Sequence, residues 1–248
     1  MLPPLFYAPP DCREGEIIAL PALEARHAAR VLRLERGAII VVANGLGDAC
    51  RAELMTVSAK SVTARVHSEI REMGEPAVRL TLAAGLSTGM KFDSVVQGGT
   101  ELGVSRFIPL LTEKSKVAVE DPARARTKLS RWRNVAIAAM KQCRRSRIPE
   151  VSAPTPFRKF LQQYDRADTG LIFHPGSTAA SLDSLSLLTG VKRVMLAVGP
   201  ESGFSEEEID AARKAGFTCV NLGKRILRTE TAGPVTVALV MSRLGEFR

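Results

Sequence analysis

The chain is poor in aromatic residues, in paired cysteines and in long apolar runs, and each shortage narrows its possible functions. Phe, Trp and Tyr make up 5% of its 248 residues, so stacking on unpaired nucleic-acid bases is not expected to be its main binding mode. The four cysteines are Cys12, Cys50, Cys143 and Cys219. They form no C-x-x-C pair and have no neighbouring histidine, which argues against a disulfide framework and a zinc site.

Long apolar runs are also missing. No run approaches the length of a membrane span, and the N-terminal residues lack the charged and apolar parts of a signal peptide. We therefore expect a cytoplasmic protein with no membrane segment and no metal.

Positive charge, in contrast, is abundant. The formal net charge is +9 and the isoelectric point is near 9.8, which points to a polyanionic partner. Nine basic residues and no acid lie between Arg124 and Arg147. Because solvated surfaces normally mix both signs, this run favours phosphate contact with RNA over a bland surface. Within it, residues 127–142 predict a helix whose buried stripe includes Trp132.

The first seventy residues predict short strands separated by turns, which is typical of a small β-barrel. The strand-length segments are 16–20, 38–43, 49–54 and 61–66. Between the first two, residues 22–34 predict a helix whose stripe carries Leu23, His27, Val31 and Leu34, with four arginines around the remainder. For His27, a structural hydrogen-bonding role and a functional role both stay open.

A polar segment broken by Gly74 and Pro76 predicts a linker over residues 73–77. It separates an N-terminal domain, residues 1–72, from a C-terminal domain, residues 78–248. In the second domain, strand-like segments at 78–84, 106–111, 169–173, 194–198 and 218–222 alternate with helical ones. This alternation predicts an α/β fold with a mostly parallel sheet.

Two glycine-bearing corners near the C-terminus predict a ligand site. An apolar strand ends at Gly199-Pro200, and Ser205 with Glu208 forms a capping box for the next helix. A second loop, residues 223–232, follows the next strand, and Pro234 is expected to open the last helix. In parallel sheets such corners meet at one edge, where ligands bind. Ile226 and Leu227 interrupt this polar loop; either a bound ligand covers them or they pack on the sheet edge.

These corners carry a recognisable pattern. GPESGF, from Gly199, and LGKRILRTETA, from Leu222, resemble the C-terminal signature of the SPOUT-type ribosomal RNA methyltransferases that modify uridine N3 in 16S RNA, the small-subunit methyltransferase E family. Both motifs have the family's order and spacing. The resemblance implies a trefoil-knotted SPOUT domain that binds S-adenosyl-L-methionine in the knot, a homodimer, and an N-terminal barrel similar to the PUA RNA-binding domain. The implied partner is the 16S rRNA of the small ribosomal subunit.

The resemblance also implies roles for individual residues. The cofactor-binding set is Phe173, His174, Gly199, Pro200, Glu201, Leu222, Gly223, Ile226, Leu227 and Thr231. The RNA-binding set is Arg26, Arg30, Arg33, Lys91, Arg144, Arg145 and Arg147. The chain departs from the family pattern at four places: Ser202 replaces Gly, Lys141 an acid, Arg144 a small residue, and Gly98 or Gly99 a Lys.

Methyl transfer to uridine N3 must also remove the imide proton, so the site needs a base or a group that stabilises negative charge on uracil. Arg228 is the catalytic candidate for charge stabilisation, because a guanidinium stays protonated. Glu230 is either the base or the group that positions Arg228; a salt bridge or a helix cap is an equally open reading.

Two other functions are compatible with the composition. The chain could be a non-catalytic RNA-binding protein, or a nicotinamide-dependent enzyme that uses the same corners. The second is disfavoured because no dinucleotide-binding fingerprint occurs in the sequence.

Overall fold

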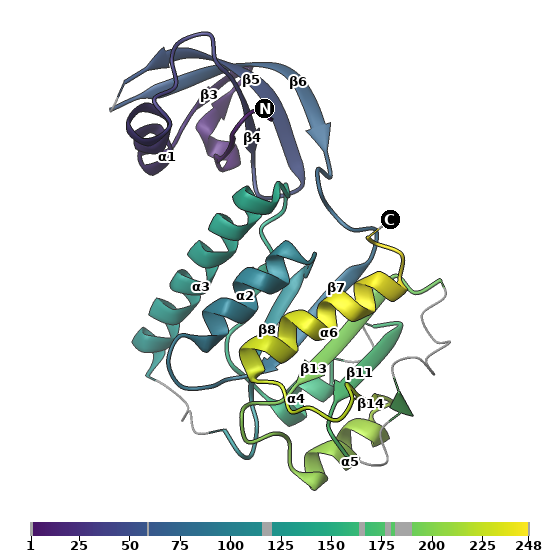
Figure 1. Ribbon diagram of the computed structural model, residues 1–248. Helices are drawn as coiled ribbons and strands as arrows, with labels where there is room; N and C mark the ends of the chain where they lie inside the picture. The colour runs from purple at the N-terminus through teal and green to yellow at the C-terminus, as the bar shows by residue number, and fades with distance from the viewer. Residues whose placement is uncertain are drawn as a thin grey trace. The chain divides into compact units, whose positions relative to one another are not determined.

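The computed structural model describes residues 2–58, 60–115, 121–163, 167–176, 180–181 and 190–247, drawn as a ribbon in Figure 1. The chain divides into two compact units, which are described separately. The first unit comprises Met1–Glu75 and Ile137–Ile148, and the second comprises Pro76–Ala136 and Pro149–Arg248. Residues 137–148, predicted to belong to the second domain, therefore group with the first unit.

The first unit contains one six-stranded sheet in the order β1-β4-β5-β6-β3-β2. Its elements are β1 (Leu5–Tyr7), the 3-10 turn η1 (Pro10–Cys12), β2 (Arg13–Glu14), β3 (Ile17–Ala19), β4 (Ile39–Ala43), β5 (Asp48–Val57) and β6 (Val62–Arg71). Strand β1 runs parallel to β4, and the other pairs are antiparallel. Phe6, Ile40 and Leu54 are fully buried between these elements. The four predicted strands are confirmed, whereas β1 is too short for a periodicity signal.

The predicted apolar stripe of the helical interlude is wrong at Leu23 and Val31, whereas Leu34 packs against the core as predicted. Residues 22–31 form α1 (Ala22–Arg26) and the π-helical turn η2 (His27–Val31). Leu23 is 82% exposed and Val31 68% exposed, while Ala25 and Ala28 are buried in the core. Ala25 and Ala28 therefore face the core, and the larger Leu23 and Val31 side chains point away from it.

The second unit contains a parallel sheet in the order β10-β8-β7-β13-β11-β14-β12, with β9 also paired to β8. Its strands are β7 (Arg79–Gly85), β8 (Arg106–Leu111), β9 (Glu150–Val151), β10 (Thr155–Pro156), β11 (Thr169–Phe173), β12 (Ala180–Ser181), β13 (Arg193–Val198) and β14 (Thr218–Asn221). Its helices are α2 (Lys91–Glu101), the N-terminal part of α3 (Pro122–Cys143), α4 (Phe157–Leu161), α5 (Glu206–Lys214) and α6 (Thr229–Arg243). The predicted parallel α/β fold is confirmed.

Helices cover both faces of this sheet. On one face, α2 and α6 lie side by side in front of the strands (Figure 1). A Cβ added at Gly98 would lie 3.0 Å from Pro234 Cγ, and one at Gly99 would lie 2.6 Å from Phe107. Helix α2 therefore has glycine at both positions because its neighbours approach so closely. On the other face, α4 and α5 bury Phe157, Phe160 and Ile209 against the strands.

The start of α5 follows its sequence signal. The Ser205 hydroxyl accepts a hydrogen bond from Glu208 N, and the Glu208 side chain accepts one from Ser205 N, which completes the predicted capping box. Gly216 ends this segment at φ +96°, as predicted.

The predicted start of the last helix at Pro234 is wrong. Helix α6 begins at Thr229, and Pro234 lies inside it. The carbonyl of Arg228 accepts hydrogen bonds from Thr231 N and Ala232 N, so the helical turn is already closed before the proline. The signature loop is correspondingly shorter than its sequence suggested.

Two expectations about composition can be compared with the structure. Trp132 is 4% exposed and packs on Phe92 at a ring-centroid distance of 4.6 Å, which confirms it as a core residue. All four cysteines are free. Within the described ranges, no helix is long and apolar enough to cross a bilayer, and no metal-binding cluster of side chains occurs.

Candidate active site

Three loops meet at the carboxyl edge of the sheet in the second unit. Phe173 at the end of β11 is in register with Val198 on β13 and with Val220 on β14. The segments that follow, from His174, Gly199 and Leu222, therefore leave the sheet side by side. A hydrogen bond of 3.4 Å from Thr229 Oγ1 to Gly199 O links the last two. Such an edge is where ligands bind in parallel α/β proteins.

The loops enclose a cavity of about 320 Å³, a size that suits a cofactor. It is lined by Lys114, Phe173, His174, Pro175, Val198, Gly199, Pro200, Glu201, Ser202, Gly203, Phe204, Glu206, Asn221, Leu222, Gly223, Arg225, Ile226, Leu227, Thr229 and Ala232.

Nine of the ten predicted cofactor-binding residues line this cavity. The tenth, Thr231, is exposed on α6 and lies outside the lining, and so do Arg228 and Glu230. Arg228 is exposed at the N-cap of α6, one residue from the lining residues Leu227 and Thr229. The two catalytic candidates therefore lie beside the cavity rather than in its wall.

Lys114 is a lining residue that the motifs did not reveal. It follows β8, whose carboxyl end lies at the same sheet edge, and this placement was the available signal. Lys114 Nζ donates to Phe204 O at 3.1 Å, while Ser202 Oγ donates to Lys114 O at 2.7 Å. Ser202 does not have a positive φ, which falls instead on Gly203 at +70°. The serine therefore fits this position without a left-handed backbone, and its hydroxyl ties the loop to Lys114.

Several groups at this edge lack the partners that buried polar atoms normally have. Among the described residues, His174 Nδ1 and Glu230 Oε2 are buried without a hydrogen-bond partner. Glu206 Oε1 lies 3.9 Å from His174 Nε2. Ile226 lines the cavity and is 88% exposed, so it is not packed on the sheet edge. His174 and Ile226 line the cavity, so a bound ligand would contact both; Glu230 lies outside the lining.

The predicted RNA contact Lys91 lies at the start of α2. Its ammonium group forms an ion pair with the carboxylate of Glu201. A residue predicted to bind RNA and one predicted to bind the cofactor are thus in direct contact.

The remaining predicted RNA contacts lie in the first unit and differ in their exposure and in whether they are bonded to other residues of the unit. Arg26, Arg30 and Arg33 are exposed on or just after α1 and η2, where their charges are available to a polyanion. His27, from the same segment, packs edge-on against Phe6 at 5.9 Å between ring centroids, which favours its structural reading.

The basic segment 144–147 is built into the first unit instead. Arg145 is 3% exposed and its guanidinium pairs with the buried carboxylate of Glu75 at 2.8 Å. Its predicted role as an RNA contact is wrong in this structure, because an acid seventy positions away in the sequence holds the guanidinium inside. Arg144 donates to Pro3 O at 2.8 Å. Arg147 pairs with Glu72, and this hydrogen bond raises the pKa of the guanidinium.

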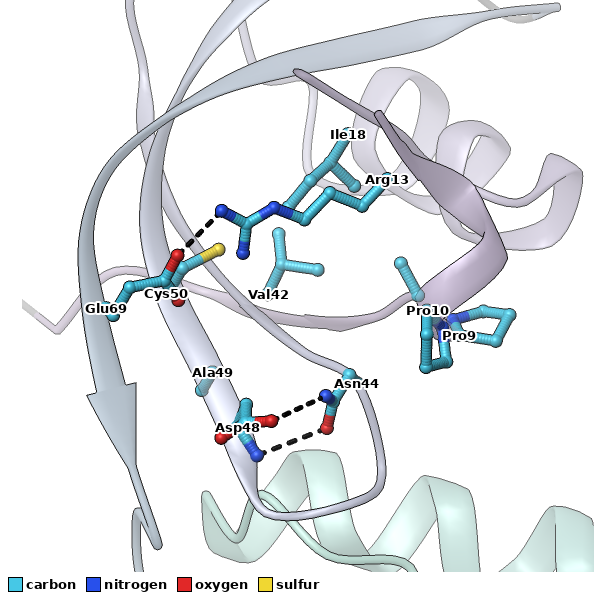
Figure 2. A pocket seen from close by; sticks show the side chains of 11 residues that line it. Pro9, Pro10, Arg13, Ile18, Val42, Asn44, Asp48, Ala49, Cys50 and Glu69 are labelled. Carbon is cyan, nitrogen blue, oxygen red and sulfur yellow. Dashed lines mark hydrogen bonds and ion pairs between the residues drawn. The ribbon is translucent and has the colours of Figure 1, made fainter. Parts of the chain in front are cut away.

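A second, smaller cavity of about 110 Å³ lies in the first unit. Figure 2 shows that its polar side chains point toward one another: Arg13 pairs with Glu69 at 2.6 Å, and Asn44 donates to Asp48 at 3.2 Å. Burial raises the pKa of the Cys50 thiol in its wall to about 11, so this cysteine is a poor nucleophile near neutral pH. These groups already satisfy one another and indicate a structural role.

Comparison with protein families gives two matches. Residues 74–241 match the RNA methyltransferase domain family, and residues 21–66 match the RNA methyltransferase PUA domain family. The second match agrees with the PUA-like N-terminal domain implied by the sequence motifs.

Individual proteins resemble almost the whole chain. The ribosomal RNA small subunit methyltransferase E of Synechocystis sp. is 32% identical over 97% of this chain and 77% of its own length. Its counterpart from Bacillus subtilis is 31% identical over 88% of this chain and 87% of its own. Among solved structures, the ribosomal RNA small subunit methyltransferase E of Neisseria gonorrhoeae bound to S-adenosyl methionine gives a TM-score of 0.89, with 32% identity and complete coverage of both chains.

Proposed function

Because the chain belongs to the ribosomal RNA small subunit methyltransferase E family, we propose that it methylates N3 of one uridine in the 16S RNA of the small ribosomal subunit, with S-adenosyl-L-methionine as the methyl donor. The observation that carries the proposal is the cavity of about 320 Å³, which both signature loops enclose. Family membership identifies an S-adenosylmethionine-dependent rRNA methyltransferase and does not support the non-catalytic alternative.

The lining of the cavity fits this cofactor. Backbone groups of the tight loops that follow Gly199 and Leu222 suit the polar edge of an adenine, while Phe173, Leu227 and Ile226 supply apolar surface for its faces. His174 Nδ1, which is buried and has no hydrogen-bond partner in the described part of the chain, is available to hydrogen-bond a ligand. When bound, the cofactor supplies the methyl group as an electrophilic sulfonium.

For the reaction itself, we propose that Arg228 donates to a uracil carbonyl as negative charge develops there. Its exposure and its place at the N-cap of α6 leave the guanidinium free to meet a substrate at the mouth of the cavity. Glu230 follows in the first turn of α6, where the positive end of the helix dipole favours a carboxylate. We assign it to positioning Arg228.

Substrate capture is proposed for the first unit. Arg26, Arg30 and Arg33 supply exposed charge there, and the residues around them match a PUA domain. The organisation into residues 1–72, a 73–77 linker and residues 78–248 is proposed as the division between RNA capture and catalysis. The natural location for such an enzyme is the cytoplasm, where ribosomal subunits are assembled.

Two further features are proposed from the family signature. The segment after β14 runs past Gly199 to reach α6, which packs on β7 and β13; this path is compatible with a trefoil knot. Ile226 lines the cavity and is 88% exposed, so the part of its side chain that a bound cofactor leaves uncovered is compatible with a homodimer interface.

The proposal is tested by mass mapping of small-subunit RNA from cells with and without this gene, followed by complementation with Arg228→Ala. We expect one methyluridine to disappear with the gene and to stay absent with the variant, while cofactor affinity remains within about tenfold, or 1.4 kcal/mol. Arg158→Ala, an exposed arginine on α4, is the matched control and should restore the modification. An unchanged methyluridine pattern in the deletion strain would refute the proposed function.

A further inference from the structure

A third cavity adjoins the cavity of the candidate active site, at the carboxyl edge of the sheet in the second unit. It measures about 170 Å³ and is lined by Leu86, Ser87, Thr88, Pro200, Glu201 and Ser202. Pro200, Glu201 and Ser202 also line the larger cavity. One three-residue segment thus faces both spaces, which is the arrangement that a two-substrate transfer reaction requires.

The two loops that form this cavity are held together by strand pairing. Ala84 on β7 is in register with Val198 on β13, so the segments after both strands start at the same level. A Cβ added at Gly85 would lie 2.2 Å from Pro200 N. Only glycine permits this approach, and the wall of the cavity is therefore specified by the sequence rather than left by loose packing.

One buried polar atom at this cavity has no hydrogen-bond partner in the described part of the protein. Among the residues that the structure describes, Ser87 Oγ is buried and no hydrogen-bond partner reaches it. A buried hydroxyl without a partner is costly and rare in native proteins. Because Ser87 lines the cavity, a molecule that enters the cavity can supply the missing hydrogen bond.

The charged groups around the cavity form a defined pattern. Glu201 lines it, and the ammonium group of Lys91 is paired with the Glu201 carboxylate. A hydroxyl and an ammonium group can donate, whereas a carboxylate only accepts. Ser87, Glu201 and Lys91 thus offer two donors and one acceptor.

This set complements the imide edge of uracil, where the N3–H donor lies between the O4 and O2 acceptors. Cytosine is disfavoured, because it presents an amino donor in place of O4 and no proton on N3.

We propose that this third cavity, which Ser87 and Glu201 line, receives the target uracil and that Glu201 accepts its N3 proton. The inference rests on the proposed function and deepens it. In the balanced step, the N3–CH₃ bond forms as the sulfonium S–CH₃ bond breaks to leave a thioether, and the N3 proton passes to the Glu201 carboxylate. Glu230, the other candidate base, lies outside the linings of both cavities. The ammonium group of Lys91 forms an ion pair with the Glu201 carboxylate and so positions it at the cavity wall.

The first test is Glu201→Gln, which keeps the shape of the side chain and removes the base. Methylation of small-subunit RNA at saturating substrate should fall at least about 100-fold. The rate of the variant should then recover as pH rises toward ionisation of the imide itself, which a purely structural role would not produce. Affinity for S-adenosylmethionine should stay within about tenfold.

The second test is Ser87→Ala, with Ser205→Ala as the matched control. Ser87→Ala should lower kcat/KM for RNA by about tenfold without lowering the melting temperature of the free protein, because the hydroxyl makes no hydrogen bond there. Ser205→Ala should show the opposite pattern, since its hydroxyl caps α5: a lower melting temperature and unchanged methylation per folded molecule.

Full activity in either cavity variant would overturn the proposal. So would a melting temperature lowered by Ser87→Ala, or a loss of cofactor affinity by Glu201→Gln in proportion to its loss of rate. A wild-type protein that binds the cofactor yet methylates no uridine would instead overturn the proposed function. The two failures are therefore distinguishable.

Discussion

Two regions of this protein are rich in polar side chains and differ in how those side chains are satisfied. In the segment 144–147, nearly every charge has a partner within the first unit: Arg145 pairs with Glu75, Arg147 with Glu72, and the backbone N–H groups of Ser146 and Arg147 donate to Glu75. At the carboxyl edge of the second unit's sheet, Ser87 Oγ and His174 Nδ1 are buried and, among the described residues, have no partner.

The difference separates structure from function. Charges that are paired within the unit stabilise a local arrangement, whereas a buried polar atom without a partner costs stability and is expected where a ligand can supply the missing hydrogen bond. The same reasoning separates the cavity of Figure 2, whose polar groups pair internally, from the two cavities at the sheet edge.

The largest loss of stability is expected from breaking the buried ion pair between Arg145 and Glu75. Arg145→Ala leaves the buried Glu75 carboxylate without its counter-ion, so we expect the free energy of unfolding to fall by about 3–5 kcal/mol. Urea unfolding followed by circular dichroism measures the change. Arg147→Ala breaks a pair that is half exposed and should cost no more than about 1 kcal/mol. Equal effects of the two variants would break the comparison.

A smaller effect is expected from the exposed arginines of the first unit. Replacing Arg26, Arg30 and Arg33 together with alanine should weaken RNA binding and reduce the slope of log affinity against log salt by about three, one for each lost phosphate contact. Filter binding at several salt concentrations measures the slope. Stability should hardly change, because all three side chains are exposed. If the variant has the same slope as the wild type, these three arginines do not contact RNA phosphates.

Much of the fold follows from local sequence. The apolar run before Gly199, the capping box at Ser205 and the buried Trp132 are features of contiguous residues, and each appears in the structure where it was predicted. Nine of the twenty residues that line the cavity were also predicted, and seven of them come from the two short signature segments.

The errors arose where distant residues decide the outcome. The basic run from Arg124 to Arg147 suggested an open electrostatic surface, but Glu72 and Glu75 neutralise its last part. Pro234 is typical of a helix start, yet α6 begins at Thr229. The Thr229 hydroxyl donates a hydrogen bond to the carbonyl of Gly199, which is distant in the sequence. Leu23 and Val31 have helical spacing, but Ala25 and Ala28 are the residues of this segment that are buried in the core.

The most direct test is calorimetric titration of S-adenosylmethionine into the wild-type protein and into His174→Leu, together with the melting temperatures of both ligand-free proteins. His67→Leu, which alters an exposed histidine paired with Glu53 in the first unit, serves as the control. If His174 Nδ1 hydrogen-bonds the bound cofactor, His174→Leu should weaken cofactor binding by about 1 kcal/mol, or about fivefold, without lowering the melting temperature of the ligand-free protein. Unchanged affinity, or a protein that melts earlier, would contradict the account.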